Sequence, residues 1–396
     1  MGFRRLWLGK VKAGIIGAGF ISGAHVDALR RLGYVDIVAL AGEGDEEARA
    51  RASEWGIPRA YGDYRDLLAD KDVQVVHNCT PNWLHFEING AALEAGKHLL
   101  SEKPLAVNSQ QSSTLVRLAR DLPLVAAVDF NHRSYPQIRQ ARRMVQTGRL
   151  GHVKLGYGGY FQDWLLRASD YNWRVDPELG GPSRAIADIG SHWYDLLRFV
   201  TGLRATEVFA ELRVVHPQRQ RPTRGNGSST FSQVGDGGGK ESVDVRTEDA
   251  ASVALRLTDG AFASFVVSQV SAGRKNRLFL EIAGTECSMS WDGENPELLW
   301  VGHRSKANEI VMRDPSLMDP EARTATRLPG GHPEGWADAL CRGLKDIYDF
   351  ILAGGDQRVD KVPFATFEDG HEAILMVEAA MRSSAEGRWI RLEAER

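Results

Sequence analysis

The sequence has few cysteines, no excess of charge of either sign and no long hydrophobic run. Cys79, Cys287 and Cys341 are widely spaced and odd in number, which argues against a disulfide framework and fits a reducing compartment. None belongs to a short pair of metal-binding spacing. No apolar run approaches the length of a membrane span, and the apolar stretch in residues 1–10 is too short for a signal peptide. We therefore expect a soluble cytoplasmic protein.

The charge balance excludes a second group of functions. Lys and Arg total 49 against 52 Asp and Glu, a net charge of -3, which gives no overall attraction for nucleic acid or for an anionic membrane. The 396 residues, of ordinary globular composition, exceed what one hydrophobic core usually organises. We expect two domains, at 1–128 and 129–396.

The N-terminal segment has the pattern of a nucleotide-binding turn. An apolar strand at 11–16 leads into Gly17-Ala-Gly19-Phe20-Ile21, and helical spacing follows. Gly17 permits a tight turn, and Gly19 lets the backbone approach a pyrophosphate at the helix start. Ser22 replaces the third glycine of the usual motif. The alternative is that the glycines serve only the turn.

A second strand, at 35–41, ends where such a unit places an acid for the adenosine ribose. Gly42 occupies the expected position and Glu43 follows it, so the sequence leaves NAD and NADP both open.

Strands and helices then alternate through residue 128, which predicts an α/β fold with a doubly wound parallel (Rossmann) sheet. Because ligands bind beyond the carboxyl ends of parallel strands, four loops are expected to share one crevice. They are the glycine turn, Thr80 to Asn82, Glu102 to Pro104, and Asn131.

The second half changes pattern. Apolar alternation at 153–161, 205–215, 251–257, 261–269 and 278–283, with glycine turns, predicts an open, mainly antiparallel sheet in an α+β domain. Helices are expected at 136–148, 336–352 and 367–383. Residues 217–241 are rich in Gly, Ser, Arg and Gln, which indicates a long loop.

Asp188-Ile-Gly-Ser-His192 is the strongest catalytic candidate in this half. A spacing of four places Asp188 and His192 on one helical face, with Asp195 one turn on, and a histidine beside carboxylates can act as a base. A helix cap with a structural histidine is an alternative. A metal site is disfavoured because further ligands at short spacing are missing, so we expect no metal.

Three further stretches are candidates for ligand contact. Residues 160–164, with Asp163 and Trp164, and residues 171–174 mix aromatic and polar side chains, which suits a sugar ring as well as a buried aromatic cluster. His332 precedes a helix, where a cap or a substrate contact is open. Lys103, between Glu102 and Pro104, lies in either a solvated turn or a rigid catalytic position.

Together these motifs resemble the Gfo/Idh/MocA oxidoreductases. The matches are the glycine turn with His25, Thr80-Pro81-Asn82 with His85, Glu102-Lys103-Pro104, Asn131 with Arg133, Trp173-Arg174, and Asp188 to His192, in the family's order and spacing. His132 stands where relatives often have an aromatic residue. Within the family the chain looks most like the sugar and glycoside dehydrogenases, such as levoglucosan and glucoside 3-dehydrogenases.

The resemblance implies an NAD(P)-dependent dehydrogenase that moves a hydride between a secondary hydroxyl of a sugar, glycoside or polyol and the nicotinamide. It implies that His192 removes the hydroxyl proton, that Asp188 orients His192 or hydrogen-bonds a sugar hydroxyl, and that Lys103 stabilises the developing alkoxide. Whether Lys103 or His192 is the main proton acceptor stays open. It also implies a cis Lys103–Pro104 bond, Lys103 within reach of His192, and a homodimer or homotetramer. Alternatives are an inositol dehydrogenase, a redox-assisted glycoside hydrolase and a sugar sensor.

The resulting expectations for the site are as follows. The cofactor-binding residues are Gly17, Gly19, Phe20, Ile21, Glu43, Thr80, Pro81, Asn82, His85, Glu102, Lys103, Asn131, Trp173 and Arg174. The substrate-binding residues are Lys103, Asp163, Trp164, Asp188, His192 and His332.

Overall fold

The computed structural model describes residues 10–223 and 239–392 and divides into two compact units. The first comprises 1–131 with 340–372, and the second comprises 132–339 with 373–396. This division differs from the two continuous domains expected from the sequence. The chain returns to the first unit late, because side chains of 340–372 pack there: Tyr348 Oη lies 2.8 Å from His77 Nε2.

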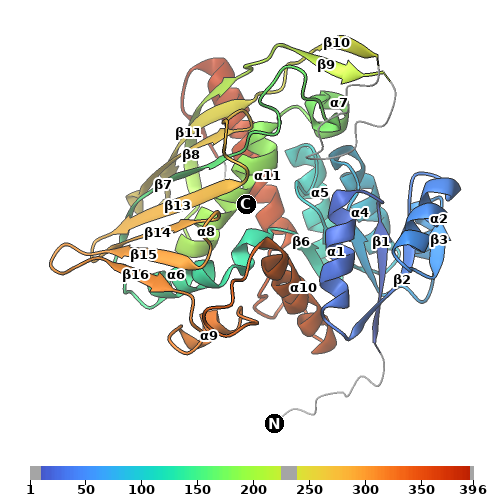
Figure 1. The fold of residues 1–396 in the computed structure, drawn as a ribbon, viewed down its shortest axis with the longest axis horizontal. Helices are drawn as coiled ribbons and strands as arrows, with labels where there is room; N and C mark the ends of the chain where they lie inside the picture. The colour runs from blue at the N-terminus through green and yellow to red at the C-terminus, as the bar shows by residue number, and fades with distance from the viewer. Residues whose placement is uncertain (1–9, 224–238, 393–396) are drawn as a thin grey trace. The chain divides into compact units, whose positions relative to one another are not determined.

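The first unit is a six-stranded parallel sheet in the order β3-β2-β1-β4-β5-β6, which confirms the expected Rossmann fold (Figure 1). The strands are β1 (Val11–Ile16), β2 (Val35–Ala41), β3 (Arg59–Tyr61), β4 (Val75–Asn78), β5 (His98–Ser101) and β6 (Ala126–Val128). The helices between them are α1 (Phe20–Arg30), α2 (Asp45–Glu54), α3 (Tyr64–Ala69), η1 (Asn82–Leu84), α4 (His85–Glu94) and α5 (Ser109–Arg120).

The second unit is a nine-stranded mixed sheet in the order β16-β15-β14-β13-β7-β12-β11-β8-β17. Its pairs are antiparallel except β12 with β7. The strands are β7 (Val153–Phe161), β8 (Ala205–Arg213), β11 (Ala250–Leu257), β12 (Phe262–Ser268), β13 (Arg277–Gly284), β14 (Ser288–Asp292), β15 (Leu298–Gly302), β16 (Glu309–Met312) and β17 (Ile390–Arg391). The mainly antiparallel sheet is confirmed, whereas β14, β15 and β16 were not anticipated.

Helices α6 (Pro136–Gln146) and α8 (Ser191–Thr201) pack on one face of this sheet (Figure 1). Pro136 starts α6, and Ile138, Ala141 and Met144 form its buried stripe. Trp193 of α8 stacks on Phe265 of the sheet, with ring centroids 4.5 Å apart. The remaining helices are η2 (Asn131–Ser134), η3 (Trp173–Val175), α7 (Pro177–Gly180), η4 (Ile186–Gly190), η5 (Thr258–Gly260), α9 (Pro320–Arg323), α10 (Trp336–Leu352) and α11 (Phe367–Glu386).

The prediction of one long loop at 217–241 is wrong at both ends. β9 (Gln218–Pro222) and β10 (Lys240–Asp244) pair antiparallel, and residues 224–238 lie outside the described part of the chain. The polar composition of this segment suggested an exposed loop. Its arginine Arg219 is instead fully buried, because it forms an ion pair with Asp249. None of the described helices combines the length and apolarity that a membrane span requires.

Candidate active site

The glycine turn between β1 and α1 has the form that a dinucleotide requires. Gly17 has a φ of +105°, and a Cβ there would lie 2.7 Å from the carbonyl oxygen of Cys79. Gly19 caps α1 without a side-chain hydrogen bond, and a Cβ at Gly19 would meet no atom within 4 Å. The turn therefore leaves open the space in front of the helix start, where a pyrophosphate binds in Rossmann units.

Three further expected cofactor-binding residues, Phe20, Ile21 and Glu43, are partly or largely exposed in this unit. Phe20 is 57% exposed at the start of α1, and Ile21 is half-buried beside it. Glu43 follows β2, is exposed, and its backbone N–H donates to Glu47 Oε2 at 2.8 Å. An acid thus stands just past the end of β2, one residue beyond Gly42.

The turn after β4 is tied to the turn after β5. His85 is fully buried, with Nε2 2.8 Å from the carbonyl oxygen of Thr80 and Nδ1 2.6 Å from that of Pro104. Pro81 and Asn82 complete the first turn and are half-buried. Both ring nitrogens of His85 are engaged by the backbone, so its effect on a cofactor would be exerted through the position of the two turns.

Glu102 and Lys103 are held from several directions. The Lys103–Pro104 bond is cis, as the family resemblance implies. Glu102 is buried, and its Oε2 accepts from the backbone N–H of Lys103 at 3.1 Å. Lys103 is half-buried. Burial would raise the pKa of Glu102, but the charges of His25 and Lys103 lower it below its ordinary value, so Glu102 is ionised.

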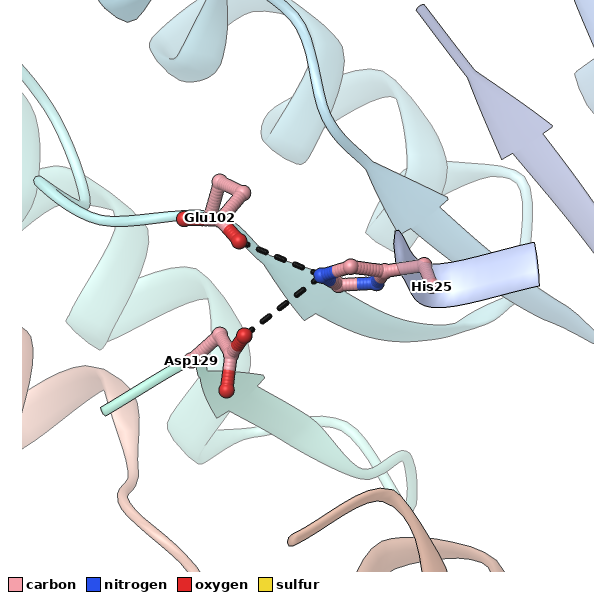
Figure 2. Close-up of side chains that lie close together, drawn as sticks. All are labelled: His25, Glu102 and Asp129. Carbon is pink, nitrogen blue, oxygen red and sulfur yellow. Dashed lines mark hydrogen bonds and ion pairs between the residues drawn. The ribbon is translucent and has the colours of Figure 1, made fainter. Parts of the chain in front are cut away.

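Behind this turn lies a buried histidine that the sequence analysis matched to the family but gave no role. Figure 2 shows Nε2 of His25 facing two carboxyl groups, Glu102 Oε1 at 3.1 Å and Asp129 Oδ2 at 3.4 Å. Burial opposes charge on His25, but the Cys79 sulfur and the two carboxyl groups raise its pKa well above its ordinary value. The cluster is therefore an imidazolium between two acids.

The charge on His25 determines which ring nitrogen of His77 carries a proton in the hydrogen-bonded series His25, His77 and Tyr348. His25 Nδ1 lies 2.9 Å from His77 Nδ1, and His77 Nε2 lies 2.8 Å from Tyr348 Oη. Burial and the charge of His25 lower the pKa of His77 well below its usual value, so His77 is neutral. His25 then donates from Nδ1, and His77 donates from Nε2 to the tyrosine.

Among the described residues, His25, Glu102 and Asp129 are also the group whose donor atoms lie close enough together to hold a metal ion. A proton on His25 Nε2 satisfies the same three atoms. Burial raises the pKa of Asp129 to about 6, which fits a carboxyl group that shares this proton with Glu102. That the protein uses no metal stays a prediction.

Asn131 is the last of the expected cofactor-binding residues in the first unit. It is buried, and its Oδ1 has no hydrogen-bond partner among the described residues. Buried acceptors are nearly always paired, so an unpaired one at a predicted binding position is what a ligand amide would satisfy. With the open glycine turn, this atom makes the first unit fit a nicotinamide dinucleotide.

In the second unit, Asp188 lies in the π-helical turn η4, just before α8. Its Oδ2 accepts from Gln269 Nε2 at 2.8 Å, and its Oδ1 lies 3.7 Å from Arg174 Nε. Arg184 can only donate, and it donates to Gln269 Oε1 at 3.0 Å. This fixes the orientation of the Gln269 amide, which therefore donates to Asp188 and holds it as a carboxylate.

His192 is buried at the start of α8, and its Nδ1 lies 3.3 Å from Nδ1 of His132. Asp195, which the sequence analysis placed beside His192, accepts two hydrogen bonds from Arg133, one of them at 2.8 Å from Nε. The neighbour of His192 along this helix is thus engaged with an arginine. His132, expected only as an unusual residue, supplies the imidazole facing His192.

The remaining expected residues of the second unit have the following surroundings, besides the contact of Arg174 with Asp188 given above. The half-buried Asp163 accepts from Lys275 Nζ at 2.7 Å and from the Gly273 N–H at 3.0 Å, so it anchors that loop. Trp164 Nε1 donates to Gln162, and the guanidinium carbon of Arg174 lies 4.4 Å from the ring centroid of Trp173. His332 is exposed.

Several of the candidate functional residues were not predicted from the sequence. Asp129 and Gln269 belong to no recognised motif, and His77 sits inside an apolar strand. A buried polar residue in such a strand is the signal that could have marked His77. Gln269 and His132 gain their meaning only from partners 81 and 60 residues away.

Comparison with known proteins covers both units. Residues 11–130 match the oxidoreductase family model with an NAD-binding Rossmann fold, and residues 138–290 match the GFO/IDH/MocA C-terminal domain. Levoglucosan dehydrogenase of Pseudarthrobacter phenanthrenivorans is 29% identical over 395 residues, covering 96% of this chain and 97% of the relative. D-glucoside 3-dehydrogenase of Escherichia coli is 32% identical over 202 residues, covering 50% of this chain and 56% of the relative.

Solved structures agree. Levoglucosan dehydrogenase in complex with NADH and levoglucosan has a TM-score of 0.86 at 26% identity, covering 97% of this chain and 100% of that one. The parallel and antiparallel sheets, the glycine turn and both family models lead to one conclusion. The chain is an NAD-binding oxidoreductase that belongs to the Gfo/Idh/MocA family.

Proposed function

We propose that the protein oxidises a secondary hydroxyl of a sugar, glycoside or polyol to a ketone, with NAD as the acceptor. The observation that carries this proposal is the arrangement around η4 and α8. There, Asp188 accepts a hydrogen bond from Gln269, and Nδ1 of the buried His192 faces Nδ1 of His132, so we assign the proton step to the other ring nitrogen of His192, Nε2. The substrates named for levoglucosan dehydrogenase and D-glucoside 3-dehydrogenase support the carbohydrate class.

In this reaction the residues of the chain would accept the hydroxyl proton and stabilise the negative charge that develops on the oxygen. When bound, the nicotinamide accepts the hydride. His192 Nε2 takes the hydroxyl proton, and Asp188 holds a neighbouring hydroxyl by accepting its hydrogen bond. Lys103 stabilises the negative charge that develops on the oxygen. Lys103 belongs to the first unit and His192 to the second. Whether they act on the same substrate is therefore tested by the kinetics of variants at both positions.

The surroundings of Glu43 favour NAD over NADP. The first turn of α2 carries Asp45, Glu46 and Glu47, which would repel the 2'-phosphate of NADP. The nearby cations are already engaged, since Arg49 pairs with Asp45 at 2.7 Å. We therefore expect a lower KM for NAD than for NADP.

We also propose that two copies associate through the outer face of the nine-stranded sheet. Tyr157, Phe209, Phe262 and Val266 are exposed on the adjacent strands β7 and β12 and on β8, which β11 separates from β12. They alternate with buried residues, and this face lies opposite the apolar core of the unit. Exposed apolar side chains on a sheet face are a common feature of protein interfaces.

The test is a panel of sugars, glycosides and polyols, inositol included, assayed with NAD and with NADP by nicotinamide absorbance. Reduction of NAD by at least one carbohydrate is expected. Release of free sugar from a glycoside without net NADH would point instead to a redox-assisted hydrolase. Ligand binding with neither reaction would point to a sensor.

A further inference from the structure

Two buried imidazoles face each other in the second unit. The Nδ1 atoms of His132 and His192 are 3.3 Å apart, the ring centroids 4.6 Å, and the ring planes make an angle of 70°. His132 is 4% exposed and His192 is 7% exposed. At this separation one proton lies between the two nitrogens, because two bare lone pairs would repel each other.

The pair is fixed in place by its neighbours in the chain. Arg133, next to His132, makes a two-bond ion pair with Asp195, which is one turn beyond His192 on α8. The segment that carries His132 is thereby tied to the helix that carries His192. A bidentate pair of this kind restrains both position and angle, so the distance between the imidazoles is set by the fold.

The position of the shared proton decides what His192 can do. If His132 donates, a neutral His192 carries its proton on Nε2 and has no lone pair there for a substrate. If His192 donates from Nδ1, its Nε2 is bare and can act as a base. The donated bond also remains in place when Nε2 takes up a proton, since the imidazolium has a proton on both nitrogens.

We propose that His132 is a positioning residue that accepts the Nδ1 proton of His192 and so holds His192 in the tautomer required of a base. This inference rests on the proposed function, because it concerns the proton step of that reaction. His132 takes the part that a carboxylate plays in a Ser-His-Asp triad, with a neutral acceptor in place of a charged one.

Other titratable groups face this pair from the elements packed around it. Tyr135 and Tyr160 place their rings 5.9 Å and 5.8 Å from His132, and burial raises the pKa of both phenols, so they stay neutral. Among the described residues, Asp188 acts on Tyr160 and Asp338 acts on Tyr135, and the ion pair of Arg133 and Asp195 involves the chain neighbour of His132 and the residue one turn beyond His192.

Two substitutions at position 132 separate the hydrogen bond from the packing. His132→Phe keeps an aromatic ring and removes the acceptor, whereas His132→Asn places an amide oxygen close to the position of Nδ1. With the native substrate found by the panel, we expect His132→Phe to lower kcat about 10- to 100-fold with less than about a threefold change in KM. The acid limb of its kcat–pH profile should shift, and His132→Asn should restore most of the activity.

The protein without substrate or cofactor provides a separate readout. In histidine-labelled ¹⁵N NMR, with His192→Asn used to assign the signal, native His192 should be protonated at Nδ1 and bare at Nε2. This tautomer should be lost in His132→Phe and kept in His132→Asn. Native His192 protonated at Nε2, or His132→Phe with native kcat and pH profile, would overturn the proposal. If the panel yields no substrate, the proposed function fails while the NMR result still decides the tautomer.

Discussion

Glu102→Gln tests the charge that the structure assigns to the buried cluster around His25. Glu102 accepts twice, from His25 Nε2 at 3.1 Å and from the Lys103 backbone N–H at 3.1 Å. Glutamine has one acceptor oxygen, so one of these donors loses its partner, and the negative charge beside His25 is gone. Loss of a hydrogen bond to a charged group costs about 1.5–3 kcal/mol. Because Asp129 still faces His25, we expect about 2 kcal/mol of lost stability.

The loss should depend on pH with a defined sign. The pKa of Glu102 is lowered from 4.5, so its contribution is present above that value and disappears as the pH falls through the folded-state pKa. The pKa of His25 is raised from 6.5, so its contribution is complete below that value and disappears as the pH rises through the folded-state pKa. The free energy of unfolding of the native protein should exceed that of the variant by the largest amount between pH 4.5 and 6.5.

The measurement is urea denaturation of the native protein and the variant over a pH range that extends below 4.5 and above 6.5, where the two contributions should disappear. Glu87→Gln is the matched control, since Glu87 is exposed and its pairing with Arg65 should contribute little. A stability difference that does not fall as the pH rises above 6.5 would mean that His25 is neutral, and the proton assignment of His25, His77 and Tyr348 would then be wrong.

Three further perturbations test other parts of the account. Gly17→Ala should destabilise the first unit, because its Cβ would lie 2.7 Å from a carbonyl oxygen, whereas Gly19→Ala should keep the melting temperature and weaken NAD binding at least about tenfold. Calorimetry measures both effects, and equal stability of the two variants would contradict the geometry. Gln269→Leu should lower kcat about tenfold by releasing Asp188, and native turnover would count against the role of Asp188. Phe262→Glu should give monomers in sedimentation, and an unchanged mass would rule out the sheet face as the interface.

The features that the sequence predicted are local ones. Gly17 and Gly19 predict a turn because the strand, the glycines and the helix are adjacent in the chain. Residues 102–104 predict the end of a strand because Pro cannot donate a hydrogen bond to a sheet ladder. The alternation of strands and helices led to the Rossmann sheet for the same reason. Periodicity over a few residues is enough where the partners are neighbours.

What the sequence missed depends on distant partners. The β9–β10 pair looks like a loop because Arg219 seems too polar to be buried, until Asp249 is placed against it. His25 meets Glu102 across 77 positions, and Tyr348 reaches His77 across 271. No local pattern encodes which of the possible partners a polar residue will find.

The most direct test of the proposed function is the steady-state rate of NADH formation by four variants on the best substrate of the panel. Lys103→Met and His192→Ala remove the proposed catalytic groups, and Lys154→Met and His152→Ala are controls of the same type at exposed positions of the second unit. We predict that the first two lose at least about 100-fold in kcat while NAD binding is kept, and that the controls match the native enzyme. Near-native turnover in both Lys103→Met and His192→Ala would contradict the account.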